Sequence, residues 1–289
     1  MTIPKHLADA LRRFSQREGV TPFMTLLAAY FTLLARYSGA EDLPIGVAIA
    51  NRRHREVEGL IGFFVNSLVL RGDLSGTPTF RDLVGRVRDL ALRAYANQDL
   101  PFDELVDELR PDRDPSRHPL FQVGFTHFND PLPTMELPGL ELRPEDLYNG
   151  TSKLDLLLLL TEAQDTIQGS LEYSADLFEP ETAQRMVRHF LVLLEGITKD
   201  PDRSIWALPI LPAEEEDLVL RAWNRTEREY PDAACVHHLF EAQAARSPDA
   251  LAVVFEGESL TYGELDTRAS KAAHLLRSLG VGPGALVGI

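Results

Sequence analysis

One stretch of this sequence limits the possible folds more than any other: residues 23–37 are apolar on almost every side of a helix. Thr21 and Pro22 precede it as an N-cap and a first helical residue, and Ser38-Gly39 ends it. A helix that is apolar all round must be covered on every side. The sequence therefore predicts a buried central helix with further layers of structure packed around it.

Other segments supply those layers. Leu7, Leu11 and Phe14 recur at the spacing of one helix face, which predicts an amphipathic helix before the central one. Short apolar and β-branched runs predict strands, and longer periodic runs predict helices. The strands are expected at 43–50, 63–70, 120–128, 154–160 and 167–173, the helices at 80–91, 101–109 and 178–197, and a proline-rich loop at 111–119. Helices and strands mixed without strict alternation predict an α/β or α+β domain over residues 1–200.

Residues 201–235 have the composition of a linker, with four prolines and an acidic run at 214–217. They also contain Ile205, Trp206, Leu208 and Trp223, which a freely mobile tether would leave exposed to water. We therefore predict a segment that packs along a domain surface.

A new pattern begins at residue 236. It predicts a helix at 236–245, a strand at 251–255, a turn at Glu256-Gly257 and a helix at 262–279. A further strand is expected to begin at 285–289, and a strand without neighbours buries little. We therefore expect residues 236–289 to be a truncated part of a larger domain.

Charge and apolar run length exclude several classes of protein. The chain of 289 residues has 29 basic and 44 acidic residues, a net charge of -15. This balance argues against binding to nucleic acid or to anionic membranes. The longest apolar run, residues 156–160, is far shorter than the ~20 residues of a membrane-spanning helix. No signal peptide is present, so we expect a soluble, cytoplasmic protein.

No residue pattern taken alone predicts a catalytic or metal site. His237 and His238 are adjacent and would point about 100° apart on a helix, so they are expected to be structural. Cys235, the single cysteine, lies among Pro, Asp and Ala and is expected to be an unreactive thiol. The glycines Gly280, Gly282 and Gly284 follow a helix, whereas a dinucleotide-binding loop follows a strand.

The charged loop and the segment after the first predicted strand are the remaining candidates. Asp114, Ser116 and His118 contain the residue types of a hydrolase triad, but triads are assembled from distant segments. A structural or substrate-facing loop is the better interpretation. Asn51, Arg52 and Arg53 are expected to anchor a loop by charge-assisted hydrogen bonds.

Several motifs, in order, resemble the condensation domains of nonribosomal peptide synthetases. The sequence GVAIANRRHREVEGL at 46–60 leads into IGFFVNSLVLR at 61–71, which resembles the fifth core motif of that family. PFDELVDELRPDRD at 101–114 and RDPSRHPLFQVGF at 113–125 resemble the sixth and seventh. Residues 236–284, with LTYGEL at 260–265, resemble the opening of an adenylation domain.

The resemblance implies the C-terminal lobe of a chloramphenicol-acetyltransferase-like fold at 1–200, a linker at 201–235 and an incomplete α/β adenylation start at 236–289. It implies peptide-bond formation between aminoacyl groups that carrier domains hold on phosphopantetheine. The family's active-site motif HHxxxDG belongs to the other lobe. His237-His238 cannot replace it, because Ala242 and Gln243 occupy the Asp and Gly positions. No catalytic, cofactor or metal residue is therefore assigned, and the isolated chain is expected to be inactive.

The resemblance also implies which residues border the substrate tunnel: Asn66, Ser116, Arg117 and His118. Expected partners are the N-terminal lobe, the remainder of the adenylation domain, and peptidyl carrier domains. ATP and Mg²⁺ would act in the intact enzyme, since the phosphate-binding loop and a later lysine are expected beyond Ile289. Two alternatives remain: a docking module without catalysis, and a free acyltransferase using His54 or His118. The lobe alone would also expose apolar surface and tend to aggregate or dimerise.

Overall fold

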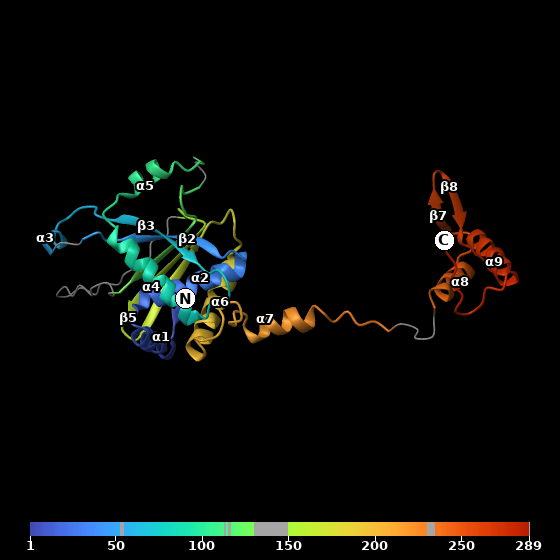
Figure 1. The fold of residues 1–289 in the computed structure, drawn as a ribbon, viewed down its shortest axis with the longest axis horizontal. Coiled ribbons are helices and arrows are strands. Elements are labelled where there is room, and N and C mark those ends of the chain that lie inside the picture. The colour runs from blue at the N-terminus through green and yellow to red at the C-terminus, as the bar shows by residue number, and fades with distance from the viewer. Residues whose placement is uncertain (53–54, 113, 115–116, 130–149, 230–234, 289) are drawn as a thin grey trace, which may run out of the picture. The chain divides into compact units, whose positions relative to one another are not determined.

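The computed structural model describes residues 1–52, 55–112, 114, 117–129, 150–229 and 235–288. The chain forms two compact units, Met1–Asn224 and Arg225–Ile289, called unit 1 and unit 2 below (Figure 1). Each unit is described by itself.

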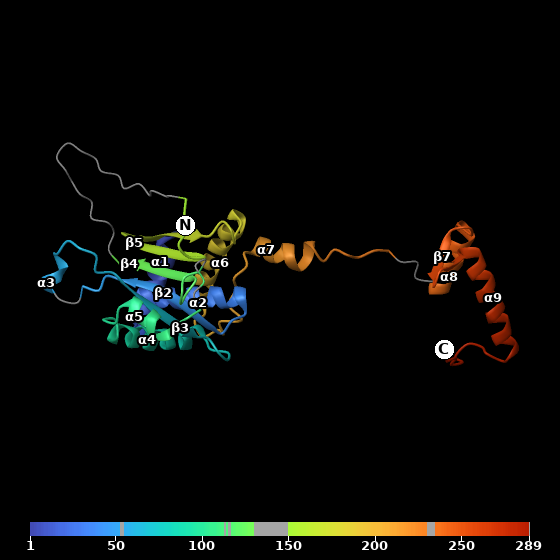
Figure 2. The same cartoon turned by 90° about the horizontal axis from the view of Figure 1, so that it is seen from above.

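Unit 1 is built on a six-stranded mixed sheet with the order β1-β6-β5-β4-β2-β3. Figure 2 shows β5, β4, β2 and β3 side by side in this order. The pairs β2/β4 and β4/β5 are parallel, and the other three pairs are antiparallel. The strands are β1 Thr2–Ile3, β2 Asp42–Ile49, β3 Asn66–Asp73, β4 Val123–Phe128, β5 Leu156–Ala163 and β6 Thr166–Tyr173.

Helices cover one face of this sheet. The buried side chains of α1, α2, α4 and α6 form one core with alternate residues of the strands, among them Ile45 and Val47 of β2. Residues between these alternate positions point to the opposite face. The helices of the first 200 residues are α1 Lys5–Glu18, α2 Pro22–Ser38, α3 Arg55–Glu58, α4 Phe80–Ala96, α5 Phe102–Leu109 and α6 Pro180–Lys199.

The helix α2 is the buried central helix that the sequence predicts. Every residue from 24 to 35 is buried. The side chain of Thr21 accepts a hydrogen bond from the Met24 amide at 3.3 Å, and Gly39 ends the helix with φ 71°. No single helix of the described residues is long and apolar enough to cross a membrane; α1 and α2 reach that threshold only as a pair bent by 106°.

The predicted α/β arrangement is confirmed, and the differences lie at element ends and in two short elements. The strand β3 begins at Asn66, not at residue 63, and the Phe63 side chain is fully outside the core. The short elements β1 and α3 were not predicted. The strand β1 pairs with β6 through Thr2 and Gln168, a contact that no local pattern reveals.

The first part of the linker packs on unit 1, as predicted. Ile205 and Leu208 are buried, and the Trp206 indole donates a hydrogen bond to the Gly76 carbonyl at 2.9 Å. The chain then forms α7 Ala213–Asp217 and a π-helical turn, Leu218–Ala222, which the sequence did not predict. The prediction of packing is wrong for Trp223, whose exposure is 68%.

Unit 2 consists of α8 Val236–Arg246, the hairpin β7 Leu251–Phe255 and β8 Glu258–Thr261, and α9 Tyr262–Ser278. The predicted turn at Glu256-Gly257 is confirmed: both residues have positive φ, the conformation of a tight hairpin turn. Residues 285–288 form no strand, so that prediction is wrong for the part the structure describes. A strand needs a hydrogen-bonded neighbour, and among the described residues of unit 2 β7 and β8 pair only with each other.

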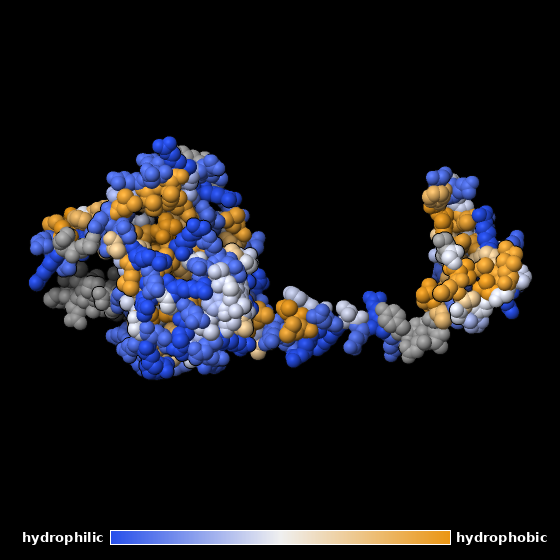
Figure 3. Space-filling view, viewed as in Figure 1, coloured by the Kyte–Doolittle hydropathy of each residue, from blue (hydrophilic) through white to orange (hydrophobic). Residues whose placement is uncertain are grey.

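Unit 2 buries very little apolar surface. Ala244 is the one buried residue among those described in it. Figure 3 shows hydrophobic side chains gathered on its surface over β7 and α8. The exposed large hydrophobic residues described in unit 2, including those of α9 and its C-cap, are Val236, Leu239, Leu251, Val253, Val254, Phe255, Leu275, Leu279, Leu286 and Val287.

Candidate functional site

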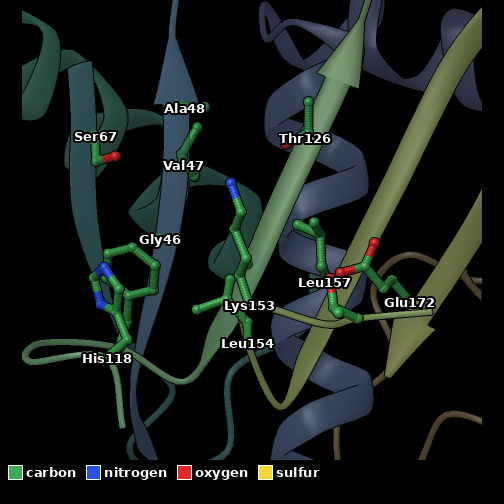
Figure 4. Close-up of a pocket in the computed structure, with 13 residues that line it drawn as sticks. Gly46, Val47, Ala48, Ser67, His118, Thr126, Lys153, Leu154, Leu157 and Glu172 are labelled. Carbon is green, nitrogen blue, oxygen red and sulfur yellow. The ribbon is translucent and has the colours of Figure 1, made fainter. Parts of the chain in front are cut away.

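A cavity of about 560 Å³ opens on the sheet face opposite the helices (Figure 4). Side chains from five neighbouring strands line it, mostly at the positions that alternate with core residues. These include Gly46, Ala48, Ser67, Gly124, Thr126, Leu157 and Glu172, and the connections before β4 and β5 add His118, Phe121, Thr151, Lys153 and Leu154.

Two paired glycines create the hollow. Gly46 of β2 lies opposite Gly124 of β4 in the parallel register. A methyl group on Gly46 would lie 2.0 Å from the Phe121 ring, and one on Gly124 would lie 2.7 Å from Leu154 and Leu157. Glycine inside a strand weakens the strand, so two at adjoining positions mark a place where space is needed. This signal was present in the sequence, but the pairing that gives it meaning was not.

An aromatic cluster forms one wall of the cavity. The ring of His118 lies 3.8 Å from the ring of Phe121 and 5.2 Å from that of Phe102, measured between centroids. Burial lowers the pKa of His118, and a hydrogen bond with the Phe121 backbone offsets this only in part. The imidazole is therefore neutral at pH 7. Its main contribution to the cavity is an aromatic surface, not a proton to donate.

Two charged side chains and three hydroxyls provide the polar part of the lining. Figure 4 shows the Lys153 ammonium extending toward Val47 and Ala48, with the Glu172 carboxylate near Leu157. Lys153 is exposed and Glu172 is half-buried, so the cation lies at the mouth of the cavity. Sequence reasoning did not single out either residue.

Asn66 has a different position from the one predicted. It does not line the cavity, and its side chain uses all its hydrogen-bonding capacity on the backbone. Nδ2 donates to the carbonyls of Gln98 at 3.0 Å and Leu100 at 2.8 Å. Oδ1 accepts from the amides of Ser67 at 2.9 Å and Phe102 at 3.1 Å. Asn66 therefore holds Phe102, and through it the aromatic wall, against β3.

Of the other predicted tunnel residues, His118 and Arg117 lie among the residues that the structure describes. His118 is part of the lining. Arg117 has a side chain that is 71% exposed and lies 3.9 Å from the Asp114 carboxylate. Ser116 lies outside the described residues. The cavity as a whole can bind an apolar group, or one with both apolar and polar parts, beside the neutral aromatic surface of His118 and Phe121.

The loop before β3 is anchored by Arg52, as predicted. Its guanidinium donates to the carbonyls of Val57, Glu58 and Gly62, and lies 4.2 Å above the Phe64 ring. Asn51 has φ 51°, so the chain turns sharply there. Arg53 and His54 lie outside the described residues.

In unit 2 the structure brings Cys235, His237 and His238 together, although the sequence treats them separately. One ligand atom of each lies within 4.8 Å of the others, and all three residues are exposed. His238 Nδ1 accepts a hydrogen bond from the Cys235 amide at 3.3 Å, as part of the helix cap. The positive end of a helix opposes a bound cation. We therefore assign no metal to this cluster.

Comparison with known proteins places this chain in a family. Residues 1–220 match the condensation domain, and residues 240–289 match the AMP-binding enzyme family. One of the linear gramicidin synthase proteins of Brevibacillus parabrevis is 46% identical over 285 residues, which cover 98% of this chain and 6% of that protein. Malpinin synthetase of Mortierella alpina is 45% identical over 283 residues, which cover 98% of this chain and 4% of that protein. This chain thus corresponds to a small part of each relative.

Solved structures agree on the fold. A four-domain nonribosomal peptide synthetase bound to AMP and glycine matches with a TM-score of 0.82 at 22% identity, over 98% of this chain and 22% of its own. The X-domain from teicoplanin biosynthesis matches with a TM-score of 0.67 at 32% identity, over 73% of this chain and 49% of its own. The chain belongs to the condensation-domain family of nonribosomal peptide synthetases, with the start of an AMP-binding adenylation domain behind it.

Proposed function

We propose that the cavity face of unit 1 forms one wall of the tunnel in which a nonribosomal peptide synthetase joins two carrier-tethered aminoacyl groups. The observation that supports this most directly is the hollow made by Gly46 and Gly124 on a sheet face that the helices leave uncovered. The peptide-forming domain, the adjoining adenylation domain and the carriers would act together in the cytoplasm. The domain limits proposed are 1–200, 201–235 and 236–289.

The reaction requires little acid–base catalysis from the residues of this wall. The acceptor amine forms a C–N bond to the thioester carbonyl as the C–S bond breaks and the carrier thiol leaves. Because a thioester is already activated, the largest gain comes from holding amine and carbonyl in contact. The sequence contains no HHxxxDG motif, and its neutral His118 is part of an aromatic surface. The chain's own residues would therefore shape and orient the reacting groups.

The family's cofactors would meet this cavity in different ways, and ATP and Mg²⁺ would act outside it. Phosphopantetheine would reach the tunnel on carrier domains, as part of the substrate. The described residues of unit 2 do not fit an ATP site, since Ala244 is the one buried residue among them and a triphosphate needs an enclosed set of donors. No step of the mechanism is assigned to ATP or Mg²⁺ here.

Two substitutions at one position test the wall. In a synthetase that contains this chain, His118→Ala removes the ring, and His118→Phe keeps an aromatic surface without a proton. We expect His118→Ala to slow peptide-bond formation about tenfold and His118→Phe to remain near the wild-type rate. The readout is dipeptide formation on preloaded carrier domains, with ATP–pyrophosphate exchange as the internal control for the adenylation domain.

The outcomes separate the alternatives. Equal loss in both variants would indicate proton transfer by His118, as in a free acyltransferase. No loss in either would contradict the tunnel wall and leave a docking module. Asn66→Ala is expected to slow condensation as well, because Asn66 holds Phe102 and the aromatic wall against β3. Arg117→Ala, which removes a side chain that is 71% exposed, should change the rate little. The Asn66 variant should also lose stability, because four backbone hydrogen bonds depend on it.

A further inference from the structure

A buried histidine outside the cavity joins three helices. The hydroxyl of Tyr37, near the end of α2, lies 2.6 Å from Nδ1 of His189 in α6. The Nε2 atom of His189 lies 2.9 Å from a carboxylate oxygen of Glu215 in α7. The His189 side chain is 5% exposed, and that of Glu215 is 24% exposed. This chain of hydrogen bonds thus connects the core of unit 1 to the first helix of the linker.

The hydrogen-bond donors and acceptors of the three groups match one another. Burial raises the pKa of Tyr37, so its hydroxyl keeps its proton at neutral pH. The hydroxyl can donate to Nδ1 of a neutral imidazole, while Nε2–H donates to the Glu215 carboxylate. If the imidazole takes a second proton, Nδ1–H donates to the tyrosine oxygen instead. Both contacts therefore survive protonation of His189.

Apart from these contacts, few interactions hold the helix α7 on the rest of unit 1. None of its residues is buried, and none of those in the π-helical turn that follows is buried. Pro212 at its N-cap makes no side-chain hydrogen bond. A helix this short is unstable by itself in water. The linker upstream is held more firmly, because Arg36 donates to the Leu208 carbonyl at 2.7 Å and Ile210 packs against the core.

We propose that Tyr37, His189 and Glu215 form a clamp that holds the first linker helix on the condensation lobe, and that its opening releases residues 211–222 as a longer tether to unit 2. The clamp can open because its strongest contact is a partly buried hydrogen bond to a carboxylate, not a hydrophobic surface. Closed, it fixes the point at which the linker leaves the lobe. Open, it lets α7 unfold and lengthens the connection to the adenylation part.

Substitutions of neighbouring glutamates test the clamp in the full chain. Glu215→Ala removes the histidine's partner, whereas Glu216→Ala removes a carboxylate of the same helix that has no contact with His189. We expect Glu215→Ala to speed amide hydrogen exchange of residues 214–223 by about 10- to 100-fold, the loss typical of a hydrogen bond to a charged group. Glu216→Ala should change it less than about threefold, and the exchange of α2 should remain as in the wild type.

Two further measurements keep the proposal falsifiable. Tyr37→Phe removes one of the two contacts, so it should give a smaller acceleration in the same amides without a change in α2. Tryptic cleavage after Arg221 should accelerate in the Glu215→Ala chain, with cleavage after Arg225 and Arg228 unchanged as an internal reference. Wild-type exchange in Glu215→Ala, or an equal effect of Glu216→Ala, would overturn the clamp.

The dependence on pH distinguishes a clamp from a histidine switch. Tyr37 from α2 and Glu215 from α7 contact His189 directly. Arg185 of α6 lies 3.9 Å from the Glu215 carboxylate, and Arg185 and Arg188 both act electrostatically on Tyr37. Because Tyr37 can act as donor or acceptor, protection of residues 214–223 should stay constant within about threefold from pH 8 to pH 5.5. Loss of protection as the pH falls through that range would contradict this arrangement.

Discussion

Two helices of equal length, α2 in unit 1 and α9 in unit 2, have opposite environments. Each has 17 residues, and each begins at a threonine whose side chain accepts a backbone hydrogen bond. Thr261 and Glu264 even give α9 a complete capping box. Yet α2 is buried from residue 24 to 35, whereas α9 has no buried residue. Local signals set where both helices begin, but only α2 is also stabilised by tertiary packing.

The same contrast holds for the two units as wholes. The core of unit 1 joins side chains from α1, α2, α4 and α6 and from all six strands, including Ile3 of the short β1. Unit 2 has caps, a hairpin turn and helices, but its apolar residues face outward. A structure with correct local features and little buried apolar area has little to offset its conformational entropy. Unit 1 is therefore expected to fold by itself, and unit 2 to depend on further packing.

The largest expected difference between the two units is in hydrogen exchange, measured along the intact chain. Amides of α2 should open only by global unfolding of unit 1, and amides of α9 should open by local fraying. We expect protection factors in α2 to exceed those in α9 by at least about 1000-fold. Similar protection in both helices would show that unit 2 has a stability its buried surface does not explain.

A matched pair of truncations compares the two units energetically. Leu27 is fully buried, and Leu275 is 60% exposed. Leu27→Ala should lower the free energy of unfolding of unit 1 by about 2–5 kcal/mol. Leu275→Ala should change it by less than about 0.5 kcal/mol. Because Trp206 and Trp223 both lie in unit 1, tryptophan fluorescence during denaturant unfolding reports that unit. A large effect of Leu275→Ala would mean that the units stabilise each other.

Two glycines of unit 1, one in a strand and one in a helix, are expected to differ by a smaller amount in the stability change on substitution by alanine. Gly46→Ala would drive a methyl group into the Phe121 ring, which should cost about 1–3 kcal/mol and narrow the cavity. Gly85 in α4 has no atom within 4 Å of an added methyl group. Gly85→Ala should therefore stabilise unit 1 by about 0.5–1 kcal/mol. Thermal unfolding of both variants measures the difference, and equal midpoints would contradict the tight packing around Gly46.

These residues also show what the sequence can and cannot predict. The burial of α2 was predictable, because an apolar helix has no stable exposed form. The cavity was not, since it depends on Gly46 facing Gly124, on two strands that lie far apart in the sequence. His118 was predicted through its motif, whereas Lys153 and Glu172 join it only through strand order. Asn66 was predicted as a tunnel residue, but its contacts make it a support for Phe102.

The smallest expected effect concerns the pH dependence of unit 1, and it tests whether His118 belongs to the wall. Burial lowers the pKa of His118 and also that of His127. The unfolded chain therefore binds more protons than the folded chain as the pH falls below about 6.5, so unit 1 loses stability on acidification. His118→Phe should reduce the stability lost between pH 7.5 and 5.5 by a few tenths of a kcal/mol, about the size expected for a partly solvated group. His127 is present in both chains, so its contribution cancels in the difference.

The control for this measurement is His6→Gln, which changes an exposed histidine of α1. The difference between the two variants separates the effect of the wall from that of removing a histidine as such. Denaturation midpoints at the two pH values give the comparison directly. If His118→Phe retained the full wild-type loss, the imidazole would have to be solvated and protonated in the folded state. The neutral aromatic wall would then be wrong, and His118 would become available for proton transfer in the tunnel.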